Sequence, residues 1–127
     1  MFHPFHHALA TPDKPAYIMA RSGETVSYRE LEDRSNQGAQ LFRRLGLSRG
    51  DSIALLMDNN PRYFEICFAA QRFGLFYTAM SSRLSVQEAE YILGDCAAQV
   101  LIVAASLAGQ AAELLARNPR IRQRYSV

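Results

Sequence analysis

The chain has 127 residues, of which 49% are hydrophobic and 20% charged, and this balance fits one globular core and excludes collagen-like, disordered and low-complexity proteins. The formal net charge is +2, but Arg117, Arg120, Arg122 and Arg124 leave ten basic against twelve acidic side chains before them, a net −2. Lys14 is the only lysine, and no basic face with interleaved aromatic residues stands out. We therefore expect no nucleic-acid partner.

The two cysteines indicate a reducing compartment. Cys67 and Cys96 lie in apolar stretches without C-x-x-C spacing, which predicts buried free thiols and argues against a zinc site. Residues 1–10 lack the charged and apolar regions of a signal peptide, and no later segment is apolar enough for a membrane span. We predict a cytoplasmic protein with no membrane span.

The first residues contain all three histidines of the chain. His3, His6 and His7 precede the first predicted element, and a metal site needs a rigid scaffold to fix its ligands. We therefore predict a flexible or surface-packed terminus rather than metal binding, and an extended segment over residues 1–15.

A hairpin and then a helix are predicted next. The runs 16–20 and 25–27 flank the turn signal Ser22-Gly23, which is typical of a small β-hairpin. Ser27 followed by Glu30 is a capping box, in which the hydroxyl accepts from the backbone N–H of residue 30 and the carboxylate accepts from that of residue 27. The first long helix is predicted to begin here.

This helix has an apolar face that includes small residues. The face consists of Leu31, Gly38, Leu41, Phe42 and Leu45. The small Ser35, Gly38 and Ala39 allow a neighbouring element to approach closely. Gly46 is placed as a left-handed stop, which gives a helix of about four to five turns.

After residue 45 the pattern alternates as βαβαβα. Strands are predicted at residues 53–57, 75–80 and 100–104, and helices at 62–73, 85–96 and 106–116. Asn60 and Pro61 open the first of these helices and Gly74 closes it, and Ser85 with Glu88 forms a second capping box.

Two segments after residue 45 indicate how much of the chain is buried in a core. The helix at 62–73 is apolar nearly all round, which predicts burial on several sides. Residues 120–127 have little that would hold them in a core.

The alternation predicts an α/β fold: a small N-terminal β-hairpin followed by βαβαβα with a mostly parallel sheet and right-handed crossovers. We divide the chain into an extended segment 1–15, a partial α/β subdomain 16–116 and a basic tail 117–127 at the end of a fragment. The helix at 62–73 has more apolar surface to bury than so small a sheet supplies, which indicates an incomplete domain.

Motifs for catalysis are missing from the sequence. It has no phosphate-binding G-x-x-x-x-G-K-[ST] loop, no dinucleotide fingerprint and no G-x-S-x-G elbow. Ser27 and Ser85 are interpreted as helix caps rather than nucleophiles. Glu30, Glu32 and Asp33 point to different sides of a helix, so they do not predict a catalytic carboxylate pair.

Arg83 lies in a loop between the carboxyl end of a strand and the next helix, where α/β sheets often bind ligands. Both contact with an anion and pairing with a local carboxylate or carbonyl fit this position, and pairing is favoured. We predict no catalytic, cofactor-binding or metal-binding residue.

The order of the motifs carries a resemblance. They are Thr11-Pro12-Asp13-Lys14-Pro15-Ala16, Ser27-Tyr28-Arg29-Glu30-Leu31, Gly50-Asp51-Ser52-Ile53-Ala54, Asn60 with Phe64 to Gly74, Arg83-Leu84-Ser85 and Tyr91-Ile92-Leu93. Over about residues 11–104 the chain resembles the N-terminal region of the AMP-forming adenylate superfamily, and within it the fatty-acyl-CoA and related acyl-CoA synthetases. Ser81-Ser82 departs from the Asn-Pro that many members have before the arginine.

The resemblance implies a two-step reaction. A carboxylate attacks the α-phosphate of Mg-ATP to give acyl-adenylate and pyrophosphate, and the thiol of coenzyme A then displaces AMP. In the family this chemistry uses a Ser/Thr/Gly-rich phosphate loop, an aromatic-Thr-Glu motif, a ribose-binding aspartate and a C-terminal lysine, none of which occurs here. ATP, Mg²⁺, coenzyme A and a fatty or other carboxylic acid are therefore expected for the full-length parent, a fatty-acid or carboxylate-CoA ligase, and neither cofactors nor activity for this fragment.

The expected partner is the missing remainder of the same enzyme, and self-association through exposed apolar surface fits the incomplete core. An alternative reading is a free-standing α/β protein-interaction module without catalysis. A flavodoxin-like nucleotide binder is less favoured, because it needs a phosphate site at a strand end.

Overall fold

The computed structural model describes residues 3–121 and 123–127, and the chain folds into two compact units. Unit 1 consists of the chain up to Leu47 together with Pro61–Phe73, and unit 2 consists of Ser48–Asn60 and Gly74–Val127. The two units therefore interleave along the sequence.

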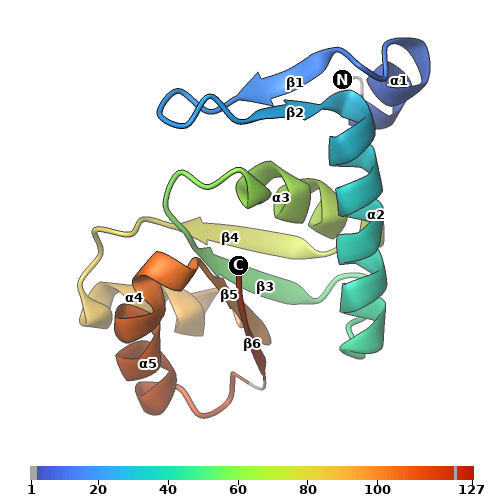
Figure 1. Ribbon diagram of the computed structural model, residues 1–127. Helices are drawn as coiled ribbons and strands as arrows, with labels where there is room; N and C mark the ends of the chain where they lie inside the picture. Colours follow the sequence, from blue (N-terminus) through green and yellow to red (C-terminus); the bar gives the residue numbers. More distant parts are fainter. Residues whose placement is uncertain (1–2, 122) are drawn as a thin grey trace. The chain divides into compact units, whose positions relative to one another are not determined.

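Among its described residues, unit 1 contains a hairpin and three helices, which can be followed in Figure 1. The elements are α1 (Pro4–Ala10), β1 (Pro15–Ile18), β2 (Thr25–Ser27), α2 (Tyr28–Arg44) and α3 (Arg62–Phe73). β1 and β2 pair antiparallel, with Ile18 opposite Thr25, which confirms the predicted hairpin.

Helix α1 corrects the expectation of an extended segment over residues 1–15. Pro4 lies at the start of the helix and is buried, and the Nδ1 atom of His3 accepts a hydrogen bond from the backbone N–H of Phe5 at 3.2 Å. Proline favours the first helical position because its missing N–H would be unpaired there anyway. The segment that contains the histidines, predicted to be a flexible or surface-packed terminus, is therefore helical over Pro4–Ala10.

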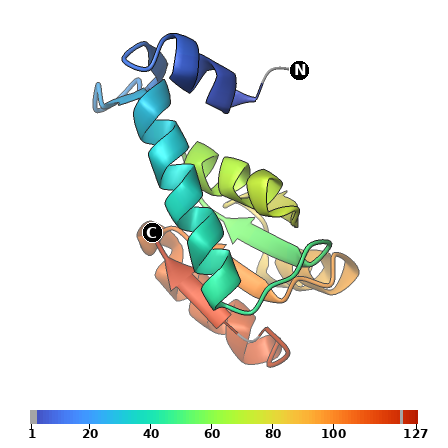
Figure 2. The ribbon, with the colours of Figure 1, turned by 90° about the vertical axis from the view of Figure 1, so that its right-hand side faces the viewer.

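Helix α2 begins and ends as predicted. The backbone N–H of Glu30 donates to Ser27 Oγ at 3.2 Å, and the backbone N–H of Ser27 donates to Glu30 Oε2 at 2.8 Å. Gly46, just beyond the helix, has a φ of +75°. A Cβ atom on Gly38 would lie 2.7 Å from the Cβ atom of Ala69, so the small residues of α2 do allow α3 to approach closely (Figure 2).

Helix α3 is only partly covered. Cys67, Ala69 and Ala70 are buried, whereas half of Phe64 is exposed to solvent and Phe68 is partly exposed. The small apolar residues of this helix are therefore in the core, while aromatic residues on it keep accessible surface.

Unit 2 is a four-stranded parallel sheet in the order β4-β3-β5-β6. Its strands are β3 (Ser52–Leu56), β4 (Phe76–Met80), β5 (Val100–Val103) and β6 (Gln123–Ser126), and its helices are α4 (Val86–Asp95), the 3₁₀ turn η1 (Ala105–Leu107) and α5 (Ala108–Arg117). The α/β class, the hairpin and the parallel sheet of the prediction are confirmed.

Strand β6 corrects the expectation that residues 120–127 stay outside the core. Its backbone pairs with β5, with Leu101 opposite position 124, and Ile121 just before it is buried. Ladder hydrogen bonds use backbone groups that every non-proline residue carries, so an arginine-rich segment can extend a sheet without an apolar pattern.

The core of unit 2 lies between the sheet and two helices, α4 and α5, which lie side by side on one face (Figure 1). Ala54, Leu56 and Leu101 from the strands join Leu93 of α4 and Leu114 of α5 in one cluster, all with 0% exposure. Ser85 and Glu88 form the predicted capping box at the start of α4. No helix among the described residues is long and apolar enough to cross a bilayer.

Candidate functional site

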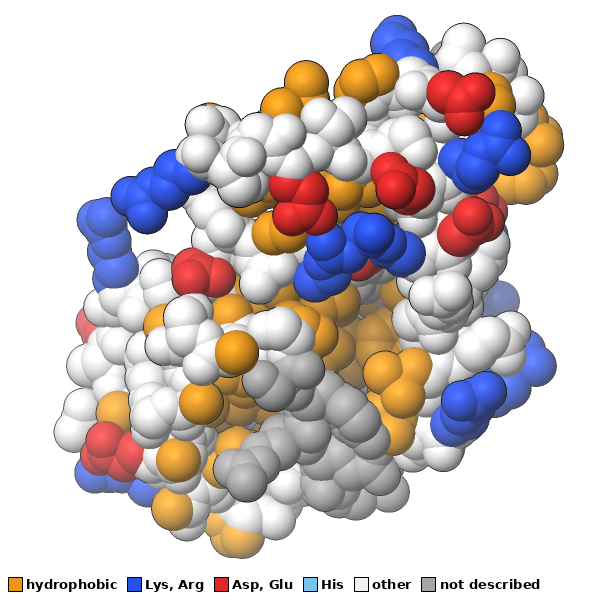
Figure 3. Space-filling model, in the orientation of Figure 1, with side chains coloured by type: hydrophobic (Ala, Val, Ile, Leu, Met, Phe, Trp, Pro, Cys, Tyr) orange, Lys and Arg blue, Asp and Glu red, His pale blue; other side chains and the backbone are white. Residues whose placement is uncertain are grey.

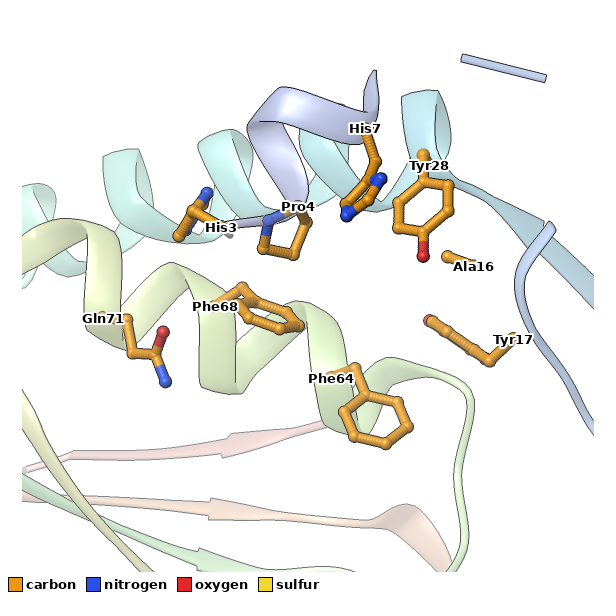
Figure 4. Close-up of a pocket in the computed structure, with 9 residues that line it drawn as sticks. All are labelled: His3, Pro4, His7, Ala16, Tyr17, Tyr28, Phe64, Phe68 and Gln71. Atoms are coloured by element: carbon orange, nitrogen blue, oxygen red, sulfur yellow. The ribbon is translucent and has the colours of Figure 1, made fainter. Parts of the chain in front are cut away.

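Unit 1 contains an open cavity of about 620 Å³ lined mainly by aromatic side chains (Figure 4). His7 comes from α1, Tyr17 from β1, Tyr28 from α2, and Phe64 and Phe68 from α3. We call these five residues the aromatic pocket. Four elements meet there, and α3 is distant in sequence from the other three.

Ring contacts hold the aromatic pocket together. His7 stacks on Tyr28 with ring centroids 4.8 Å apart, and the rings of Tyr17 and Phe64 lie 5.2 Å apart. In Figure 4 the ring of Phe68 and the hydroxyl ends of both tyrosines point toward the middle of the cavity. Such offset and tilted pairs are favourable geometries for aromatic rings, so the walls are defined by packing.

Tyr17 and His3, two of the residues that line the cavity, have pKa values shifted toward the neutral form of the side chain. The Tyr17 hydroxyl donates to the backbone carbonyl of Pro61 at 2.6 Å, and burial, followed by the negative charge of Glu65, raises the pKa of Tyr17. Burial, followed by the positive charge of Arg72, lowers the pKa of His3 at the cavity edge. The cavity is therefore suited to an uncharged, largely apolar group rather than to acid–base chemistry.

Beside the pocket lies a buried carboxylate. Glu65 is 7% exposed and accepts hydrogen bonds from Arg34 at 2.8 Å and from Arg62 at 3.0 Å. Arg62 also pairs with Glu24 in the turn between β1 and β2. The hydrogen bond to Glu65 raises the pKa of Arg34. The network ties α2, α3 and the hairpin to one another.

The acidic residues considered as a catalytic pair serve separate structural roles. Glu30 caps α2, whereas Glu32 forms an ion pair with Arg72 of α3. On the face drawn in Figure 3, acidic and basic side chains are interspersed. Glu30 and Glu32 are therefore engaged in structural contacts. The described residues hold no group of three or more His, Cys, Asp or Glu that could ligate a metal ion.

The strand ends of unit 2 form a second candidate region. The Ser106 hydroxyl, in the turn that follows β5, donates to Asp58 Oδ2 after β3 at 2.8 Å. Arg83 is exposed in the loop after β4, and no described residue forms a hydrogen bond or ion pair with its guanidinium. The predicted local pairing of Arg83 is therefore not seen within the described part of the chain.

Sequence reasoning placed Ser27 and Ser85 correctly as caps but missed the aromatic pocket. Tyr17, Tyr28 and Phe64 belong to different elements and share no spacing pattern, so they become neighbours only when the chain folds. The sequence feature that pointed to this region was the presence of apolar residues on nearly all sides of the helix at 62–73.

The model of the AMP-binding enzyme family matches residues 5–126 of the chain. The chain belongs to the AMP-binding enzyme family. It is 33% identical over 104 residues to the long-chain-fatty-acid–CoA ligase of Salmonella typhimurium, and 35% identical over 95 residues to the crotonobetaine/carnitine–CoA ligase of Escherichia coli. These alignments cover 81% and 72% of this chain but only 18% of each relative, so the chain spans about a fifth of their length.

Solved structures share the fold. The N-terminal domain of FACL13 from Mycobacterium tuberculosis superposes with a TM-score of 0.90 over 98% of this chain and 32% of that domain, at 23% identity. MatB from Rhodopseudomonas palustris gives a TM-score of 0.77 over 91% of this chain and 22% of MatB, at 22% identity. The predicted resemblance is confirmed: the chain corresponds to an N-terminal part of acyl-CoA ligases in this family.

Proposed function

We propose that the chain is the N-terminal scaffold of an ATP-dependent acyl-CoA synthetase, which converts a carboxylic acid, ATP and coenzyme A into acyl-CoA, AMP and pyrophosphate through an acyl-adenylate. The observation that carries the proposal is the family match over residues 5–126, joined to 33% identity with a long-chain-fatty-acid–CoA ligase over 81% of the chain.

A fatty acid is the proposed substrate class. The relatives described above are named for a long-chain fatty acid in one case and for crotonobetaine or carnitine in the other. Each name joins a carboxylic acid to coenzyme A, so activation of a carboxylate is the element they have in common. The fatty acid is preferred because motifs across residues 11–104 resemble fatty-acyl-CoA synthetases.

The side chains of this chain do not fit ATP, Mg²⁺ or coenzyme A. The sequence has no phosphate loop. The carboxylates of Glu30 and Glu88, at the start of α2 and α4, accept hydrogen bonds within the two capping boxes. Metal-assisted adenylation needs groups that neutralise charge along the phosphates. We therefore propose that the catalytic residues belong to the remainder of the enzyme, and that this chain alone is inactive.

We also propose a cytoplasmic location. Cys67 and Cys96 are both free thiols in the structure. Free cysteines are typical of compartments that keep thiols reduced.

The test begins with the coding sequence after the codon for Val127, which is expected to encode a Ser/Thr/Gly-rich loop ending in Pro-Lys-Gly. The longer protein is then assayed for exchange of labelled pyrophosphate into ATP. Exchange is expected only with an added carboxylic acid, and none with residues 1–127 alone. A longer protein without exchange for any fatty, aryl or short-chain acid, or exchange by the short chain itself, contradicts the proposal.

A further inference from the structure

One wall of the aromatic pocket is formed by the short β1–β2 hairpin, and apolar side chains next to it are exposed to solvent. The hairpin that contributes Tyr17 has strands of four and three residues, and Ile18 beside it is 61% exposed. A two-stranded hairpin is marginally stable by itself and normally packs against further structure. On the other side, Phe64 of α3 is 50% exposed. Exposed apolar side chains of this kind are typical of a surface that packs against another segment or protein.

Two polar groups at the cavity are available to an occupant. The hydroxyl of Tyr28 and the side-chain amide of Gln71 have no hydrogen-bond partner among the described residues, and both line the cavity. A hydroxyl can donate and accept, and an amide offers two donors and one acceptor. Backbone groups of a polypeptide segment match this combination, with an apolar side chain placed between the rings.

The charges next to the pocket are already neutralised. Glu65 is held by Arg34 and Arg62, and Glu24 is held by Arg62. A charged occupant would therefore gain little attraction and would lose its hydration among the aromatic rings. The geometry favours an uncharged segment.

We propose that the aromatic pocket is the docking site of an apolar segment from the remaining part of the same enzyme's N-terminal domain, an inference that rests on the proposed function. The comparison of lengths supports this occupant, because the fold of 98% of this chain corresponds to only 32% of the N-terminal domain of FACL13. A second copy of the chain fits less well. A two-fold interface places the same patch on both partners, and two facing hollows would leave an unfilled void.

The test compares residues 1–127 with the longer protein by thiol labelling at position 64. Phe64→Cys is labelled with a maleimide and the modified peptide is quantified by mass spectrometry. The matched control is Tyr91→Cys, because Tyr91 is an aromatic residue with 73% exposure on α4 of unit 2. Position 64 is expected to react at least about tenfold more slowly in the longer protein than in the short chain, while position 91 changes less than about twofold.

A second measurement guards against a variant that fails to fold. Hydrogen exchange of the unmodified protein is expected to slow across residues 62–73 in the longer protein. Equal labelling and equal exchange in the two proteins overturn the docking proposal, even if the longer protein is active. Protection in a longer protein that lacks pyrophosphate exchange supports docking and removes the proposed function. Protection of the short chain that grows with its own concentration assigns the pocket to self-association and also overturns the proposal.

Discussion

Through its two arginine partners, Glu65 connects α2, α3 and the hairpin of unit 1. Its carboxylate is nearly buried and binds one arginine from α2 and one from the start of α3, and the second of these also reaches Glu24 of the hairpin turn. Removing one partner from a buried ion pair is costly because it leaves the other charges without compensation. Exposed pairs are worth little because water screens them.

We predict that Glu65→Ala lowers the free energy of unfolding by about 2 kcal/mol, below the range for fully buried pairs because both arginines keep about a third of their surface exposed. Asp13→Ala is the control, since Asp13 pairs with Arg29 at the surface, and its effect is expected to stay within about 0.5 kcal/mol. Urea denaturation of the two variants measures both values. Equal effects would show that the network is not stabilising.

The capping carboxylates predict how stability responds to acid. The pKa of Glu30 is lowered by hydrogen bonds from the Ser27 backbone N–H and then its hydroxyl, and Ser85 lowers the pKa of Glu88 in the same way. A group whose pKa is lower in the folded state stabilises the fold above its unfolded pKa, and this stabilisation is lost as the pH falls through the folded value.

We therefore expect the double variant Glu30→Gln with Glu88→Gln to lose less thermal stability on acidification than the unmodified chain. Thermal unfolding followed by circular dichroism from neutral pH to about pH 3 covers the range in which carboxyl groups titrate. The two proteins should differ most at neutral pH and converge in acid. Parallel curves would mean that these caps do not contribute.

At the scale of elements, the packing of α2 on α3 depends on Gly38. A Cβ atom at this position would meet the Cβ atom of Ala69 at 2.7 Å, a distance that real Cβ atoms essentially never show. Neither atom belongs to a flexible side-chain end, so the helices themselves would have to move apart. The usual gain in helix propensity from replacing glycine works in the opposite direction.

We predict that Gly38→Ala destabilises the chain by about 1 kcal/mol, because overpacking outweighs helix propensity. Adding Ala69→Gly should recover part of this loss, since it removes the opposing Cβ atom. Gly109→Ala in α5 is the matched control, where no atom lies within 4 Å of the added group, and it should be neutral or stabilising. A double-mutant cycle measured by denaturation tests the coupling. Additive effects would place the two residues out of contact.

At the scale of the whole molecule, exposed apolar surface is the property to measure. Phe64, Ile18 and Phe76 are each at least half exposed. If these surfaces pack against the rest of an enzyme, residues 1–127 should bind an apolar fluorescent dye more strongly than the longer protein does, at equal molar concentration. Weak dye binding together with cooperative unfolding of a monomer would favour the free-standing interaction module instead.

The sequence by itself determined the features that act over a few residues. Ser27 with Glu30 and Ser85 with Glu88 predict helix starts because the cap joins atoms three residues apart, and Gly46 predicts a stop because glycine tolerates a positive φ. The alternation of strands and helices determined the α/β class in the same way. The order of these local signals was enough to indicate the family.

Tertiary structure alone decided the features that join distant residues. Strand β6 forms because β5 offers it an edge, and the pairing needs only backbone groups. The aromatic pocket forms because Tyr17 bonds to Pro61, 44 residues away, and Glu65 gathers arginines from two helices. Such contacts leave no periodic trace in the sequence, because their geometry depends on how whole elements pack and not on the spacing of residues within any one of them.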